Sequence, residues 1–253
     1  MTLTQILSAL TPLDIAGLIV LVGLWAAVTW LIEKAPPSRP SVSQLMEEYR
    51  RAWMREFARR EARVFDASLI TNLRQSTAYF ASTTLIAVGA LLALIGNTQP
   101  LQLAVEGLTG LHGATINWQL RMIPPTLFLV HAFLKFVWAN RVFGYCAVLM
   151  GAVPVDIHDL RSPALAAKAA ELNIRAAYNF NRGLRSMYFA LGALAWLISP
   201  VALIAATGAV AWFMWSREFR RHTHAILLAP VPELRPRTDP ARDASRDPSR
   251  DGA

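Results

Sequence analysis

Residues 13–32 read LDIAGLIVLVGLWAAVTWLI, twenty residues that carry one charge, Asp14, near their start. A helix rises about 1.5 Å per residue, so about 20 apolar residues cover the roughly 30 Å hydrocarbon core of a bilayer. No Lys or Arg precedes this run, and the run is longer than the apolar region of a cleavable signal peptide. The stretch therefore predicts a retained first membrane span.

Three further apolar blocks are long enough to span a bilayer, and they lie at about 79–96, 124–150 and 187–215. Hydrophobic residues make up 54% of the chain and charged residues only 17%, whereas soluble domains carry about a quarter charged residues. The sequence therefore predicts an all-α fold, an integral membrane helical bundle of about four transmembrane helices within residues 1–229.

Two of these blocks contain prolines that affect the topology. Pro124-Pro125 opens the third block, and we expect both prolines in the first helical turn, where a missing N–H needs no partner. Ser199-Pro200 interrupts the last block. This block is either one long proline-kinked helix, which we favour, or a hairpin whose halves of about 15 residues are too short to cross upright.

Positive charges set the expected orientation, because loops rich in Lys and Arg stay in the cytoplasm. Residues 1–12 carry none, residues 33–78 carry nine and residues 152–186 carry five. We therefore expect a multi-pass protein of the cell (inner) membrane, with the N-terminus outside and both charged segments in the cytoplasm. The tail conflicts with four spans, since its eight arginines after Trp215 would then lie outside.

Residues 41–75 predict a long cytoplasmic amphipathic helix. Ser41 and Gln44 have the spacing of a capping box. Six apolar residues recur at helical spacing on one side: Leu45, Met46, Tyr49, Trp53, Phe57 and Val64. Three arginines lie opposite at intervals of four: Arg51, Arg55 and Arg59. Such a helix is either a solvated connector or a helix that docks on anionic lipid or on a partner protein.

The balance of charges limits the classes of binding partner that we expect. Six acidic residues reduce the nine positive charges of residues 33–78 to +3, and no nucleic-acid-binding motif accompanies them, so we expect no nucleic acid partner. Residues 230–253 repeat Arg-Asp pairs with balanced charge, and we expect them to be disordered. The oligomeric state stays open, and a homo-oligomer is one alternative.

Charges inside a span are costly and mark candidate functional residues. His131 and Lys135 are four residues apart and share a helix face. If the third span begins at Pro124, Lys135 lies about 16 Å along it, near the bilayer centre. Lys135 then either pairs with Asp14, Asp66 or backbone carbonyls and fixes helix register, or it has a transport or binding role with His131 on the same face.

Searches for chemistry find little. The chain has no G-x-S-x-G, H-E-x-x-H or P-loop motif, and one cysteine, Cys146. No second histidine lies in any predicted span, so a haem held between two histidines is not expected. We expect no cofactor, no metal site and no enzymatic activity.

Three groups of polar and aromatic residues carry a family resemblance. Residues 66–83 read DASLITNLRQSTAYFAST, residues 135–146 read KFVWANRVFGYC and are followed by GAVP at 151–154, and residues 179–189 read NFNRGLRSMYF, before Trp196 and Pro200. Over most of residues 15–225 the chain resembles the domain-of-unknown-function family 599 of multi-pass membrane proteins. The resemblance implies a membrane protein and implies no reaction, substrate or catalytic residue.

The same segments suggest a polar cluster at the cytoplasmic ends of the spans. Its members are Asp66, Asn72, Arg74, Arg141, Asn179, Asn181, Arg182 and Arg185. Arginine binds phosphate or carboxylate well, so the cluster is either an anion site with Asp66 as internal counter-charge or a set of interfacial anchors.

Two functional hypotheses result from these patterns. The first is a non-enzymatic accessory or scaffold protein that engages a partner protein or anionic lipid through the basic cytoplasmic helix. The alternative is a small transporter or channel with a polar path around Lys135, His131 and Arg141.

Overall fold

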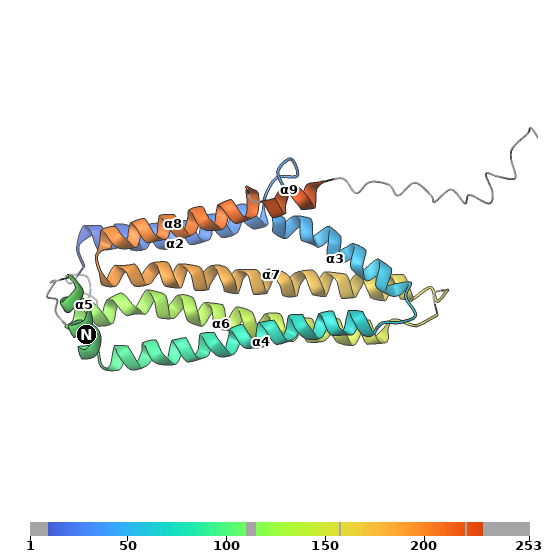
Figure 1. Ribbon diagram of the computed structural model, residues 1–253, viewed down its shortest axis with the longest axis horizontal. Helices are drawn as coiled ribbons and strands as arrows, with labels where there is room; N and C mark the ends of the chain where they lie inside the picture. The colour runs from blue at the N-terminus through green and yellow to red at the C-terminus, as the bar shows by residue number, and fades with distance from the viewer. Residues whose placement is uncertain (1–9, 110–114, 157, 221, 230–253) are drawn as a thin grey trace, which may run out of the picture.

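The computed structural model describes residues 10–109, 115–156, 158–220 and 222–229, which fold into a bundle of long helices without a strand (Figure 1). The helices are α2 (Pro12–Glu33), α3 (Val42–Ala58), α4 (Val64–Gly96), α5 (Gln99–Thr109), α6 (Thr115–Ala152), α7 (Ser162–Leu194), α8 (Pro200–Phe219) and α9 (His222–Leu228), with a 3₁₀ turn at Ala195–Leu197. The expected all-α class is confirmed. The tail predicted to be disordered, 230–253, lies outside the described residues.

Helix lengths divide the bundle into two halves. At 33, 38 and 33 residues, α4, α6 and α7 are each about 50 Å long or longer, well beyond the hydrocarbon core of a bilayer. In contrast, α2 and α8 lie side by side and have 22 and 20 residues, so they accompany α7 along only part of its length. Along the rest of α7, α3 takes the place of α2 and α8 (Figure 1). We call the α2/α8 part the apolar half and the α3 part the polar half.

Three helices of the described chain are long and apolar enough to cross a membrane: Pro12–Glu33, Val64–Gly96 and Trp118–Ala152. Their outward side chains are apolar, and Ile19, Ile86 and Leu127 are 67%, 73% and 62% exposed. Exposed aliphatic residues in such numbers need a lipid or protein environment. The predicted first, second and third spans therefore each fall within one of these helices.

The third of these helices begins earlier than the sequence predicts. Because α6 starts at Thr115, Pro124 and Pro125 lie inside the helix, and the expectation of a first-turn position is wrong. The residues before the prolines form the first turns and include the buried Trp118. Lys135 therefore lies seventeen residues, about 26 Å, beyond Trp118, next to Phe136 and close to the polar half.

The last apolar block is a hairpin, and the single kinked helix that the sequence favours is wrong. Ser199 accepts a hydrogen bond from the Ala202 backbone N–H and caps α8, whose first residue is Pro200. Proline cannot continue the preceding helix, and α8 returns beside α2 (Figure 1). The halves are not short, because α7 begins at Ser162, well before the apolar block.

The amphipathic segment predicted as one helix over 41–75 forms two. The capping box of Ser41 and Gln44 is present and begins α3, which ends at Ala58. Residues from Val64 onward belong to α4. Of the residues on the predicted apolar face, Phe57 is buried in α3, whereas Tyr49 is 41% and Val64 80% exposed.

An aromatic cluster marks where the two halves meet. The rings of Phe80 on α4, Phe136 on α6 and Phe180 on α7 lie with centroids 5.5 Å apart in each pair. A Cβ atom on Gly183 would come within 2.6 Å of the Phe136 ring, so only glycine allows this approach of α6 to α7. Glu33, the last residue of α2, lies close by, because it bonds Arg182 on α7.

Candidate functional site

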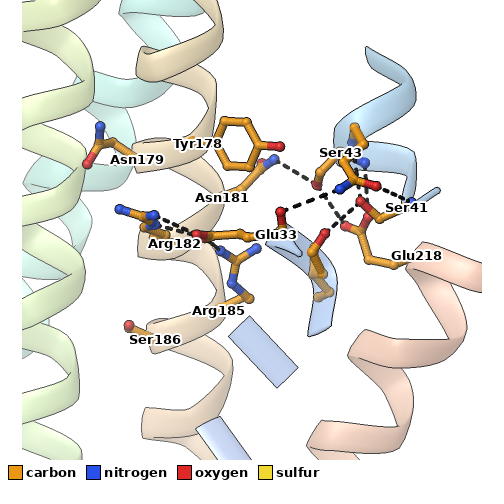
Figure 2. Close-up of polar contacts among 12 residues, drawn as sticks. Glu33, Ser41, Ser43, Tyr178, Asn179, Asn181, Arg182, Arg185, Ser186 and Glu218 are labelled. Carbon is orange, nitrogen blue, oxygen red and sulfur yellow. Dashed lines mark hydrogen bonds and ion pairs between the residues drawn. The ribbon is translucent and has the colours of Figure 1, made fainter. Parts of the chain in front are cut away.

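Charged residues converge where α2 ends and α3 begins. The Glu33 carboxylate accepts hydrogen bonds from Arg182, Nε at 2.8 Å and Nη2 at 2.5 Å, and also from Nη2 of Arg185 (Figure 2). The Arg185 side chain is 4% exposed and that of Glu33 14%. A buried arginine is costly unless its charge is matched, and Glu33 supplies that match.

A second carboxylate joins this group from α8. Glu218 accepts hydrogen bonds from the Ser43 backbone N–H at 3.0 Å and from its hydroxyl at 3.2 Å (Figure 2). Asn181 on α7 donates to the same hydroxyl at 3.4 Å. The negative charge lies at the first turn of α3, where the helix dipole stabilises it. We call Glu33, Ser43, Asn181, Arg182, Arg185 and Glu218 the boundary cluster.

The boundary cluster ties four helices together and is internally balanced. Two carboxylates face two arginines across α2, α3, α7 and α8. Three of the predicted residues, Asn181, Arg182 and Arg185, are thus brought together. Their geometry is that of an anchor, because a carboxylate of the same chain already occupies the arginines.

His131 and Lys135 lie next to this cluster on α6. His131 Nδ1 is 2.7 Å from the Ser186 hydroxyl, and its ring packs edge-on against Trp25 on α2. Lys135 follows one turn later, is half-buried and has no ion pair within the described residues. Arg141 does not join them: it is exposed and donates to the Tyr145 hydroxyl at 2.5 Å. The three residues of the transport hypothesis therefore do not line one path.

The suggested partners of Lys135 are engaged elsewhere. Asp14 lies near the start of α2, where it accepts a hydrogen bond from Trp196 Nε1 at 2.7 Å and lies 4.0 Å from Arg121. Asp66 lies in the first turn of α4 and is fully buried. Pairing of Lys135 with either aspartate is therefore not found.

Asp66 is a counter-charge, but not for the arginines expected from the sequence. Its Oδ1 accepts hydrogen bonds from Trp53 Nε1 at 2.6 Å and from Arg60 Nη1 at 3.1 Å. Trp53 belongs to α3, and Arg60 lies in the link to α4. The carboxylate thus fixes the angle between these two helices.

The remaining predicted residues are dispersed. Asn72 and Arg74 are exposed on α4 and line different grooves, Asn72 beside α3 and Arg74 beside α6. Asn179 donates to the Arg175 carbonyl of its own helix at 2.8 Å, and it points away from the boundary cluster (Figure 2). The eight-residue cluster expected from the sequence is therefore several separate contacts.

The polar half also contains polar pairs that sequence reasoning missed. Tyr178 on α7 donates to the Glu47 carboxylate on α3 at 2.5 Å, and burial together with this carboxylate raises the pKa of the Tyr178 hydroxyl. Nearby, Arg50 donates to the Asn173 side-chain oxygen. The sequence does contain a signal for these two pairs. Glu47 and Arg50 are three residues apart, and this helical spacing places both near the side of α3 that carries Met54.

Grooves in the described residues gather in the polar half. One groove, of about 440 Å³, lies between α3 and the start of α7. A second, of about 390 Å³, lies between α3 and α4, and a third, of about 410 Å³, between α4 and the end of α6. No group of three or more His, Cys, Asp or Glu side chains that could hold a metal ion occurs in the described part of the chain.

The fold and these sites define a class of protein. An all-helical bundle with three helices long and apolar enough to cross a bilayer is that of a helical membrane protein. A family model described as "Protein of unknown function, DUF599" matches residues 16–223, so the chain belongs to this family. No curated protein and no solved structure matches it.

Proposed function

We propose that the chain is a non-enzymatic membrane-anchored docking protein, whose polar half lies in the cytoplasm and binds an acidic segment of a partner protein in the groove between α3 and α7. The observation that carries the proposal is this groove. Its base is apolar, with Met54, Ala58 and Ala166, and three arginines lie along it, Arg51 and Arg55 of α3 and Arg59 just after its end. We call it the docking groove.

Charge favours an acidic partner. Arg51 is matched by Glu47, Glu48 and Glu171 at 3.0–3.2 Å. In contrast, Arg55 is exposed and forms no ion pair within 4.0 Å in the described chain, where the one ion pair of Arg59 is with Glu56. The groove therefore presents unmatched positive charge beside apolar surface, a combination that suits an acidic helix or strand carrying one apolar anchor.

Distance from the bilayer favours a protein over a lipid as the occupant. Along α7, Glu171 lies eleven residues, about 16 Å, from Arg182, and Pro163 lies about 28 Å from it. The headgroup layer extends only about 5–7 Å beyond the hydrocarbon core. A groove at this depth in the cytoplasm is out of reach of membrane lipid.

The proposed topology has five passes. Besides the three candidate spans, the end of α7 and the 20 residues of α8 run through the apolar half, and α8 is long enough for about 30 Å. The links at 34–41, 59–63 and 153–161 and the end of α8 then all lie on the same side of the apolar half, towards the polar half (Figure 1). With that side in the cytoplasm, the arginines of the tail also obey the positive-inside pattern, and the conflict of a four-span topology is removed.

Thiol labelling tests the topology. In right-side-out membrane vesicles, we expect Gln99→Cys to react with a membrane-impermeant maleimide, and Lys34→Cys and Ser249→Cys to react only after permeabilisation. The unmodified chain is the control, because its single cysteine, Cys146, is buried. Labelling of Ser249→Cys in sealed vesicles would contradict five passes.

Site-specific crosslinking tests the docking groove. We expect a photo-crosslinking amino acid at Ala167, an exposed groove residue, to trap one defined protein in cells, and Arg55→Glu with Arg59→Glu to reduce this product at least tenfold by reversing two charges. The same crosslinker at Lys168, exposed but outside the groove, is the matched control. A product that is unchanged by the charge reversal, or that forms equally at Lys168, would contradict the proposal.

A further inference from the structure

The groove between α3 and α4 has a different lining from the docking groove. From α3 it receives Met46, Arg50 and Trp53, and from α4 it receives Leu69, Asn72 and Ser76. Its volume is about 390 Å³, and none of its lining residues is acidic. An amphipathic ligand fits such a surface, with an anionic part at Arg50 and an apolar part at Met46.

Arg50 is the exceptional residue of this groove. It donates one hydrogen bond, to Asn173, and no carboxylate lies within 4.0 Å of it in the described chain. Its neighbour Arg51 contacts three glutamates. A guanidinium has five N–H donors, so four of those of Arg50 are without a protein acceptor. Burial lowers the pKa of Arg50, and a guanidinium that nevertheless stays charged attracts an anion.

The height of the groove identifies the source of that anion. Ser76 lies one helical turn from Phe80, which belongs to the aromatic cluster where the apolar half ends. One turn is about 5–6 Å, the thickness of the headgroup layer on one side of a bilayer. The groove therefore begins at the level of lipid phosphates, unlike the docking groove, and Tyr49 and Trp53 on its wall are residue types that favour this interface.

We propose that this groove is a binding site for the headgroup of an anionic phospholipid, with Arg50, Asn72 and Ser76 donating hydrogen bonds to the phosphate and its substituent. Met46, one helical turn from Ser43 of the boundary cluster, then contacts the apolar part of the lipid. Since α3 and α4 both line the groove, bound lipid holds α3 against the bundle. This site is separate from the docking groove, because the two grooves share no lining residue.

Lipid retention tests this site. The protein is purified in mild detergent, incubated with dioleoyl phosphatidylglycerol or dioleoyl phosphatidylcholine, and weighed intact by native mass spectrometry. We expect retention of phosphatidylglycerol about tenfold above phosphatidylcholine, the effect of one charge-assisted hydrogen bond. We expect Arg50→Gln to remove the preference and Arg55→Gln, an exposed arginine of the same helix outside this groove, to leave it intact.

A second variant covers the case in which Arg50→Gln does not fold. Ser76 is exposed, so Ser76→Trp fills the groove without disturbing the interior, and it should remove the preference as Arg50→Gln does. A preference that survives Ser76→Trp in folded protein would overturn the proposal. Inorganic phosphate that displaces phosphatidylglycerol at equal concentration would overturn lipid as the ligand. Crosslinking at Ala167 should be unaffected by Ser76→Trp, so failure here is separate from failure of the docking proposal.

Discussion

Glu33→Gln should unfold the protein more readily than any other single change in the boundary cluster. The substitution keeps the shape of the side chain and removes its charge, and Arg185, whose side chain is 4% exposed, is then left without its counter-charge. Removing one partner of a buried ion pair costs about 3–5 kcal/mol. We expect this loss in the free energy of unfolding, measured as a lower melting temperature in detergent.

Two further variants separate charge from packing. Arg182→Gln should cost much less, because the Arg182 side chain is 39% exposed and water replaces its partner. Glu33→Gln combined with Arg185→Met should recover most of the stability, since an apolar residue of similar length needs no counter-charge. If Glu33→Gln has the same melting temperature as the wild-type protein, the arginines are neutralised by something other than Glu33, and the anchor interpretation is wrong.

The two arginines of this cluster could be found from the sequence, but their partner could not. Asn181, Arg182 and Arg185 share a short polar segment ahead of an apolar run, and that pattern marks a helix leaving a membrane. Glu33 ends the first span and Glu218 precedes the tail, 149 and 37 residues from Arg182 and Asn181. A local pattern holds no information on which distant carboxylate completes a buried pair.

The spans illustrate the same limit. The sequence of residues 13–32 is by itself long and apolar enough to predict a membrane-crossing helix, and this helix is present as α2. The hairpin at Ser199 was misjudged because only the apolar part of α7 was counted. The polar part of α7, from Ser162 to about Arg182, packs against α3 and α6 outside the apolar half, and no measure of local hydropathy distinguishes such an extension from a loop.

The sequence shows the amphipathic pattern of α3, but it does not show the residue at which this helix ends. Phe57 is buried as the spacing predicts, and so is Met54, which the predicted face does not include, while Arg55 and Arg59 are exposed. The pattern continued past Ala58 by chance, because the next helix also begins with apolar residues, Val64 and Phe65. Neither proline nor an N-cap side chain marks the break between the two helices.

Asp66→Leu should detach α3 from the rest of the bundle. The Asp66 carboxylate is fully buried and receives hydrogen bonds from Trp53 on α3 and from Arg60 after it. Leucine matches the volume but accepts neither bond, which leaves the indole N–H without its acceptor. The loss of both hydrogen bonds to the carboxylate should lower the free energy of unfolding by about 3 kcal/mol or more.

The loss should be local, and hydrogen exchange measures where it falls. We expect amides of α3 to exchange faster by at least tenfold, while those of α2 and α8, which pack on each other, keep their protection. Asp66→Asn should show a smaller effect, because the amide oxygen still accepts from Trp53. Glu61→Gln, an exposed acid in the same link, is the matched control and should exchange as the wild-type protein does.

Both proposed sites require that α3 stay in place, so Asp66 also decides whether the two sites depend on each other. The docking groove and the lipid groove each take one wall from α3, and their other walls belong to α7 and α4. Asp66→Leu should therefore weaken crosslinking at Ala167 and retention of phosphatidylglycerol together, whereas Ser76→Trp affects only the lipid. If α3 exchanges faster in Asp66→Leu while both binding measurements stay unchanged, the partner and the lipid bind elsewhere, and α3 is a connector.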